Sequence, residues 1–93
     1  GTMKNSIGSN VETLYKLMED RVEALEFIVN QNCRMIGIRL QDMKTRPNLL
    51  VAAINRQGKV IIPGGQDSFE AGDSVIIVTT ETGLQDIHEI LAE

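Results

Sequence analysis

LLVAAINRQGKVII, at residues 49–62, is the stretch that decides the fold. Leu49–Asn55 is an apolar run with the length of a buried strand. Arg56–Gly58 follows it as a tight turn, because glycine adopts the positive φ that a short hairpin connection requires. Lys59–Ile62 returns as a second strand, and Pro63 stops it because proline cannot donate a ladder hydrogen bond. The stretch therefore predicts an antiparallel hairpin.

Two further strands are predicted, one on each side of the hairpin in the sequence. Val22–Asn30 places a row of apolar residues on one face, namely Leu25, Phe27 and Val29. Ser74–Thr80 follows a tight turn at Gly72–Asp73, and its valine and isoleucine content predicts a central strand. Phe69 interrupts the polar loop before this last strand, and we expect its side chain to point inward.

Two short helices complete the prediction. The first spans Arg39–Met43, where apolar residues recur at helical spacing, and Pro47 ends it. The second closes the chain after a capping-box pattern at Thr82 and Gln85, and its apolar stripe is Leu84, Ile87, Ile90 and Leu91. The sequence therefore predicts an α+β fold, with a mostly antiparallel four-stranded sheet and two helices on one face, in the order β-α-β-β-β-α.

The first 21 residues are expected to stand apart from this domain, which we place at residues 22–93. Residues 1–8 are polar, begin with Gly-Thr-Met as tag remnants do, and are expected to be frayed. Residues 9–21 predict a linker or dimerisation helix, because a capping box at Ser9 and Glu12 opens an apolar stripe of Val11, Leu14, Tyr15, Leu17 and Met18. The sequence leaves open whether this helix packs on its own domain or across a dimer.

The composition is that of one small domain and opposes several classes of function. The 93 residues are 42% hydrophobic and 24% charged, and no apolar run approaches the roughly 18 residues of a membrane span. The N-terminus lacks a secretion-signal pattern, which predicts a cytoplasmic protein with no direct membrane insertion. A net charge of −4 and the lack of tryptophan oppose nucleic-acid binding.

The sequence offers no recognisable active site, so we expect no enzymatic activity. The single cysteine, Cys33, cannot form an internal disulfide, and the single histidine, His88, excludes a His-rich zinc set. We expect Cys33 to be buried or half-buried rather than a reactive thiol, and His88 to flank the last apolar stripe or lie on the surface. Three acids share one loop, where we expect them to solubilise it and bond its turns: Asp67, Glu70 and Asp73.

The charges are unevenly distributed along the chain. Cys33–Val60 holds six cations against one acid, which is +5, whereas the remaining residues hold three cations against twelve acids, which is −9. Within the positive segment, Arg46 and Asn48 lie where the first short helix meets an apolar strand. Arginine donates forked hydrogen bonds to phosphate, and asparagine bonds an adenine edge. The segment predicts an anion or nucleotide pocket, with a solvated turn as the alternative.

Four segments in this order resemble the RCK_C domain, also called the TrkA C-terminal domain. They are Val22–Val29, Ile36–Met43, Leu50–Gly65 and Phe69–Val78. The Gly-Asp turn before a hydrophobic strand is a weak signal alone, whereas all four segments at these spacings are fairly specific. The domain is most similar to that of a TrkA-type potassium uptake regulatory subunit.

The resemblance implies a cytoplasmic regulatory domain of a bacterial potassium transport system, peripheral to the inner face of the cell membrane. Such domains form homodimers, associate with a membrane transporter subunit through the full-length protein, and couple small-ligand binding to gating. NAD or ATP would bind an upstream Rossmann domain that this sequence lacks. The alternatives are a sensory domain of another transporter or of a transcription regulator, and a purely structural dimerisation module.

The resemblance also implies a ligand site. Some relatives bind cyclic di-AMP, an anionic nucleotide, in a cleft between two copies of this domain. The corresponding residues here are Arg46, Asn48, Leu49 and Pro63. No metal site and no cofactor of the domain itself are expected.

Overall fold

A computed structural model describes residues 22–92. Four strands form one sheet: β1 (Glu23–Ile28), β2 (Leu49–Arg56), β3 (Lys59–Ile61) and β4 (Ser74–Thr79). The expectations for residues 1–8 and 9–21 fall outside the described residues.

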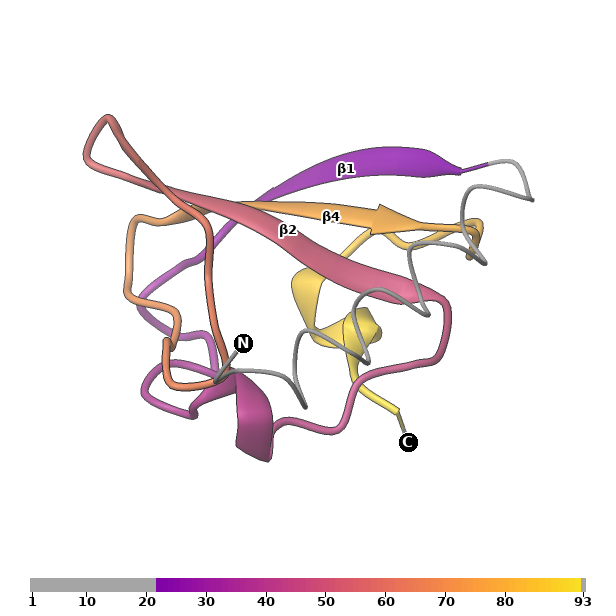
Figure 1. Ribbon diagram of the computed structural model, residues 1–93, viewed down its shortest axis with the longest axis horizontal. Helices are drawn as coiled ribbons and strands as arrows, with labels where there is room; N and C mark the ends of the chain where they lie inside the picture. Colours follow the sequence, from indigo (N-terminus) through magenta and orange to yellow (C-terminus); the bar gives the residue numbers. More distant parts are fainter. Residues whose placement is uncertain (1–21, 93) are drawn as a thin grey trace.

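The sheet has the order β1-β4-β2-β3, and each pair of neighbouring strands is antiparallel (Figure 1). β4 therefore lies between β1 and β2, as its valine and isoleucine content predicted. Its register places Ile77 opposite both Leu25 and Val51. β2 carries one extra residue between Val51 and Ala53, where the register with β4 shifts. Such a bulge bends the strand locally.

The hairpin of β2 and β3 is confirmed. Gln57 and Gly58 both have positive φ, 55° and 84°, which is typical of a two-residue turn that follows the twist of its strands. The Asn55 side chain accepts a hydrogen bond from the Gly58 amide at 3.0 Å. β3 is shorter than predicted, since it ends at Ile61.

The two predicted helices are wrong within the described residues. In their places are 3₁₀ turns, η1 (Leu40–Asp42) and η2 (Ile87–Ile90), while most of the connecting chain is irregular. The closing stripe buries Ile87 and Ile90, three residues apart, which a 3₁₀ turn aligns as well as an α-helix does. After η2 the chain extends, because Leu91 bridges to Thr45. η2 therefore spans only four residues, which is too short for a stable α-helix.

The start of η2 also differs from the prediction. Asp86, and not Thr82, caps this turn, because its carboxylate accepts from the His88 amide at 3.1 Å. Glu89 completes the capping box, since its carboxylate accepts from the Asp86 amide at 3.1 Å.

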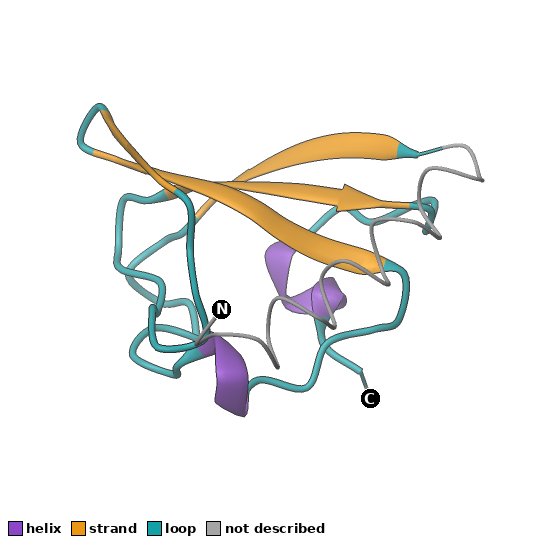
Figure 2. Cartoon of the chain, viewed as in Figure 1, coloured by secondary structure: helices purple, strands orange, loops and turns teal. Residues whose placement is uncertain are grey.

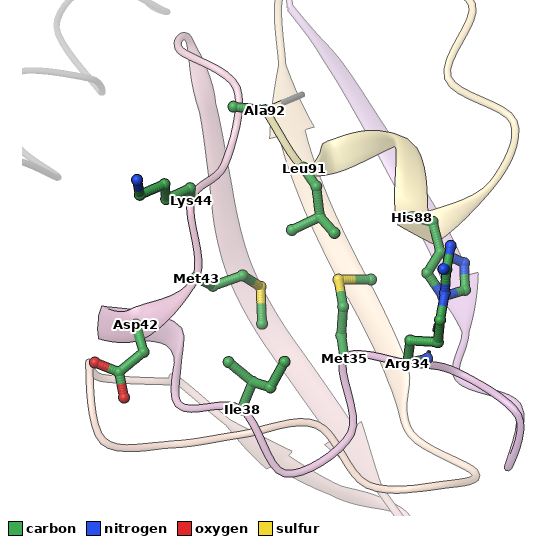
Figure 3. Close-up of a pocket in the computed structure, with 9 residues that line it drawn as sticks. All are labelled: Arg34, Met35, Ile38, Asp42, Met43, Lys44, His88, Leu91 and Ala92. Atoms are coloured by element: carbon green, nitrogen blue, oxygen red, sulfur yellow. Dashed lines mark hydrogen bonds between the residues drawn. The ribbon is translucent and has the colours of Figure 1, made fainter.

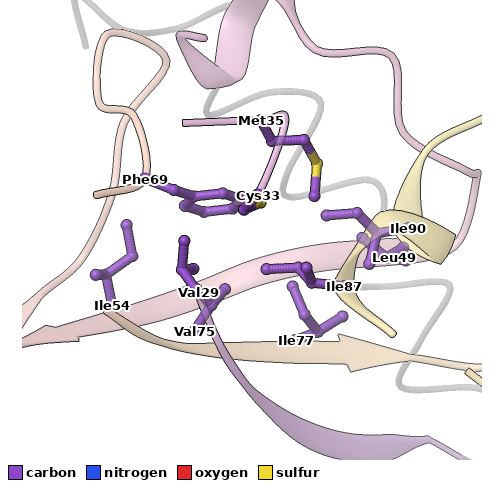
Figure 4. Close-up of a cluster of buried hydrophobic side chains, with 10 residues drawn as sticks. All are labelled: Val29, Cys33, Met35, Leu49, Ile54, Phe69, Val75, Ile77, Ile87 and Ile90. Atoms are coloured by element: carbon purple, nitrogen blue, oxygen red, sulfur yellow. The ribbon is translucent and has the colours of Figure 1, made fainter. Parts of the chain in front are cut away.

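The hydrophobic core lies between the sheet and the layer of loops and 3₁₀ turns on one of its faces (Figure 2). This is the layering that was predicted, with loops and turns where helices were expected. The core side chains come from both layers (Figure 4): Val29, Cys33, Met35, Leu49, Ile54, Phe69, Val75, Ile77, Ile87 and Ile90. Phe69 and Cys33 are buried as predicted.

Candidate functional site

Arg46 lies just ahead of β2, anchored to the last part of the described chain. Its amide donates to the Ile90 carbonyl at 2.8 Å. Its guanidinium Nη1 lies 3.7 Å from a Glu81 carboxylate oxygen, and both side chains are partly exposed. The Arg46 Nε is buried and has no hydrogen-bond partner within residues 22–92. The guanidinium therefore has hydrogen-bonding capacity that the described part of the chain leaves unused.

Asn48 and Leu49 follow at the start of β2, in different surroundings. Asn48 has a φ of 62°, a left-handed conformation that asparagine tolerates better than most residues. Its carbonyl accepts from the Thr79 hydroxyl at 2.9 Å and from the Thr80 amide at 3.2 Å. Leu49 is buried in the core opposite Thr79. Asn48 is thus the half-exposed member of this pair.

Pro63 lies elsewhere in the sheet. It comes two residues after β3, and the last pair of the hairpin ladder joins Ile61 to Ile54, in the middle of β2. From there the chain turns to η1, where the Gln41 amide donates to the Gly65 carbonyl at 2.9 Å. The structure therefore groups Arg46, Asn48 and Leu49 and leaves Pro63 beside η1.

The acids of the loop before β4 are structural. Both Asp73 oxygens accept from Arg56, at 2.9 Å from Nε and 2.8 Å from Nη2, and Oδ2 also accepts from the Glu70 amide at 2.8 Å. Arg56 extends this contact to Glu70 at 3.1 Å and to the Ser68 carbonyl at 2.9 Å. The paired charges hold the hairpin against the Gly72–Asp73 turn.

A shallow cavity of about 450 Å³, more open to solvent than enclosed, lies on the layer below the sheet (Figure 3). It lies between two segments far apart in sequence, residues 34–44 and 88–92. The lining combines apolar and charged side chains: Arg34, Met35, Ile38, Asp42, Met43, Lys44, His88, Leu91 and Ala92. Its volume is in the range of small-molecule sites.

His88 lies at one end of this cavity and both of its ring nitrogens are engaged. Nε2 accepts from the Arg34 amide at 3.2 Å, and Nδ1 lies 2.9 Å from the Asp86 carboxylate. The hydrogen bonds from His88 hold the pKa of Asp86 below its usual value. This geometry assigns the proton of the neutral ring to Nδ1. Both ring nitrogens of His88 are therefore occupied by hydrogen bonds within the described residues.

The cavity was not predicted from the sequence. Two of the six cations of the positive segment, Arg34 and Lys44, line it, and their charge was the one available signal. Their proximity to His88 and Leu91 depends on the contact between Thr45 and Leu91, which only the folded chain shows. No cluster of three metal-ligating side chains occurs within residues 22–92. No helix in that part of the chain is long and apolar enough to cross a membrane.

The fold and these sites define a small α+β module with a cationic strand start and a half-apolar cavity. The sequence matches the TrkA-C domain over residues 24–92, and the chain belongs to this family. The family confirms the resemblance that the four sequence segments indicated.

Archaeal potassium uptake proteins are among its relatives. The chain is 28% identical over 72 residues to Trk system potassium uptake protein trkA homolog 1 of Methanosarcina mazei, and 30% identical over 70 residues to homolog 2. It is 26% identical over 76 residues to the homolog of Pyrococcus abyssi. These alignments cover 77%, 75% and 81% of this chain, but only 18%, 16% and 34% of the three relatives. The chain thus spans about a third of the length of one relative and less than a fifth of the other two.

A solved structure described as an RCK domain with cda has a similar fold. The TM-score is 0.55 with 22% sequence identity, and the match covers 63% of this chain and 81% of the other. At this level of identity the similarity supports the fold alone.

Proposed function

We propose that this chain is the regulatory domain of a potassium uptake system, and that it couples ligand binding to transport rather than catalysing a reaction. The observation that carries the proposal is the family match over residues 24–92, together with relatives named as Trk potassium uptake proteins. The domain would act at the cytoplasmic face of the membrane, attached to a transporter through the rest of a longer protein. The named relatives are archaeal. A bacterial source remains our expectation from the resemblance.

The proposed ligand is an anionic nucleotide, cyclic di-AMP, bound between two copies of the domain. Arg46 would bind a phosphate, and Asn48 a base edge. Pro63 would contribute an apolar wall, whereas Leu49 would fix the start of β2 from within the core. The 3.7 Å contact between Arg46 and Glu81 supports this assignment, because a partly exposed ion pair is weak and exchanges readily for phosphate. The similar RCK domain was solved with cda.

Homodimerisation is part of the proposal, and the outer face of the sheet supports it. Most residues that alternate with the core-facing ones are apolar, namely Ala24, Ile28, Leu50, Ala53, Val60, Ile76 and Val78, and the polar members of this face are Glu26, Asn55 and Ser74. Ile28 is 57% exposed, Val60 66%, and Ile62 just after β3 is 76% exposed. An extended apolar face of this kind favours association. A two-fold axis would pair it with itself.

Calorimetric titration of the 93-residue chain with cyclic di-AMP tests the ligand. We expect saturable binding with one nucleotide per two chains. Arg46→Gln should weaken it by about tenfold, whereas Glu81→Gln should strengthen it by freeing the guanidinium. Lys59→Gln, a charge change on β3, is the matched control. An absence of heat at high protein concentration would remove this ligand from the proposal.

A structural dimerisation module without a ligand is the second candidate. The burial of Leu49 favours it, because one of the four expected contacts is occupied by the core. The two candidates differ in a measurable way. Both require a dimer, but only the first requires the dimer to respond to nucleotide.

A further inference from the structure

The cavity between residues 34–44 and 88–92 has walls that the main chain holds in place. The Ala92 amide donates to the Lys44 carbonyl at 2.9 Å, and Thr45 bridges to Leu91. At the other end, the Arg34 amide donates to His88 Nε2 at 3.2 Å. These bonds join the two segments on both sides of the opening. The cavity is therefore formed before any ligand enters, which lowers the entropic cost of binding.

Apolar side chains form the middle of the cavity. Figure 3 shows Met35, Ile38, Met43 and Leu91 directed toward one another between its two ends. Met35 belongs to the buried core, whereas Ile38 is 40% exposed. Methionine is flexible and polarisable, so a floor with two of them adapts to an aliphatic or aromatic group. The middle of the cavity thus suits an apolar body.

Positive charge lies at the ends of the cavity. Arg34 stands beside His88 at one end, and Lys44 lies at the opposite side, next to Met43, with its amine directed away from the apolar side chains (Figure 3). Within residues 22–92, the other three arginines form ion pairs with Asp42, Glu81 and Asp73, whereas Arg34 and Lys44 form none. Because Arg39 already compensates Asp42 at 3.1 Å, the lining is net positive. Such an arrangement attracts anions.

We propose that this cavity is a second ligand site, which binds a small organic anion with an apolar body. Arg34 binds the anionic group at one end, Lys44 adds to the positive field from the other, and the body lies on Met35 and Met43. The site is separate from the proposed nucleotide cleft, since none of Arg46, Asn48 and Pro63 lines it. Its ligand need not be symmetric, because each chain holds a complete cavity.

Methyl NMR with matched eight-carbon probes tests this proposal. The chain is labelled at its methionine methyl groups, and the Met35 and Met43 signals are assigned with Met35→Leu and Met43→Leu. Sodium octanoate should shift both signals saturably. The neutral 1-octanol and the cationic octylammonium should shift them at least about tenfold more weakly, because only the head group differs. Equal shifts with all three probes, or none with octanoate, would overturn the proposal.

Charge variants provide the second arm of the test. The double variant Arg34→Gln, Lys44→Gln should weaken octanoate binding by about tenfold or more, since both cations are lost. Lys59→Gln, a cation outside the cavity, should change it by less than about twofold, and Arg46→Gln should leave it unchanged. A double variant that binds octanoate as tightly as the original chain contradicts the site. Since the Arg46 variant is tested with cyclic di-AMP separately, the failure of one site leaves the other standing.

Discussion

Arg56 and Asp73 join two parts of the chain that are 17 residues apart, and their bonds are made within the fold. Asp73 is 1% exposed and accepts from two guanidinium nitrogens and one amide. A buried carboxylate that loses its partner costs more than an exposed one. The same arginine also contacts the exposed Glu70, which offers a comparison within one network.

Asp73→Asn should destabilise the domain by about 2–3 kcal/mol, because the amide cannot accept both charged hydrogen bonds. Glu70→Gln should cost less than about 1 kcal/mol, since that ion pair is exposed to water. Urea unfolding of the two variants measures both effects. Equal losses would show that burial of Asp73 adds nothing to the interaction.

The same pair makes stability dependent on pH. The hydrogen bond from Arg56 holds the pKa of Asp73 below its usual value, and the Glu70 amide adds to this against the opposing effect of burial. The folded pKa thus lies below the unfolded one, which is about 3.9. The contribution of Asp73 is therefore complete above the unfolded pKa and is lost as pH falls toward the folded one.

We expect the free energy of unfolding to decrease below about pH 5, and to decrease less in Asp73→Asn. Urea unfolding between about pH 7 and pH 3 measures the two curves. If the free energy of unfolding decreases equally at acid pH in the two proteins, other carboxylates cause the loss of stability.

At this scale the sequence predicts neighbours better than distant pairs. Asp73 was expected to bond its own turn, and its bond from the Glu70 amide confirms this. Its arginine partner was not predictable, because the pairing depends on the register of β2 with β4. Arg46 and Asn48 lie close together because one residue separates them, and their role in ligand binding stays a prediction. The position of Pro63 in the fold depends on the path of the chain after β3, which no local sequence pattern specifies.

The hairpin turn is the element whose conformation the sequence determines most directly. Gly58 has a φ of 84°, and a β-carbon there would meet no atom within 4 Å. Substitution therefore tests backbone strain alone. Gln57, in contrast, adopts a φ of 55° without the tolerance of asparagine or glycine.

Gly58→Ala should destabilise the domain by about 1 kcal/mol, the usual cost of a left-handed conformation for a residue with a β-carbon. Gln57→Asn should stabilise it, since Asn-Gly is the preferred pair for this turn. Thermal unfolding of both variants compares them directly. A rise in Tm for Gly58→Ala, or a fall for Gln57→Asn, would contradict the role of this turn.

The two 3₁₀ turns show a limit of predicting secondary structure from the sequence. Spacings of three and four residues suit an α-helix and a 3₁₀ turn alike when only two side chains are buried. For η2, a tertiary contact favours the 3₁₀ turn, because the chain after Ile90 is extended where Leu91 bridges to Thr45. The strands were predicted more closely, because apolar runs bounded by turn residues, and the alternation in Val22–Asn30, favour strands over short helices.

At the scale of the whole molecule, the outer face of the sheet is the surface to test for self-association. Val60→Lys combined with Ile62→Lys should raise the dimer dissociation constant by about tenfold or more, because it places charge in an apolar contact. Ile38→Lys, an equally apolar change on the opposite layer, is the control. Light scattering over a concentration series measures both. A dimer that survives the paired substitution uses another surface.

Ligand and dimer are thermodynamically linked if the nucleotide binds between two copies. A ligand that contacts both chains tightens the dimer by the factor by which dimerisation tightens the ligand. Cyclic di-AMP should therefore lower the dimer dissociation constant of the original chain, and should do so less for Arg46→Gln. Octanoate, bound within one chain, should leave it unchanged. Sedimentation equilibrium measures the dimer dissociation constant without ligand, with cyclic di-AMP and with octanoate. A nucleotide that binds without altering association would lie within one chain, so the coupling to transport would have to arise from a change inside the domain rather than between its copies.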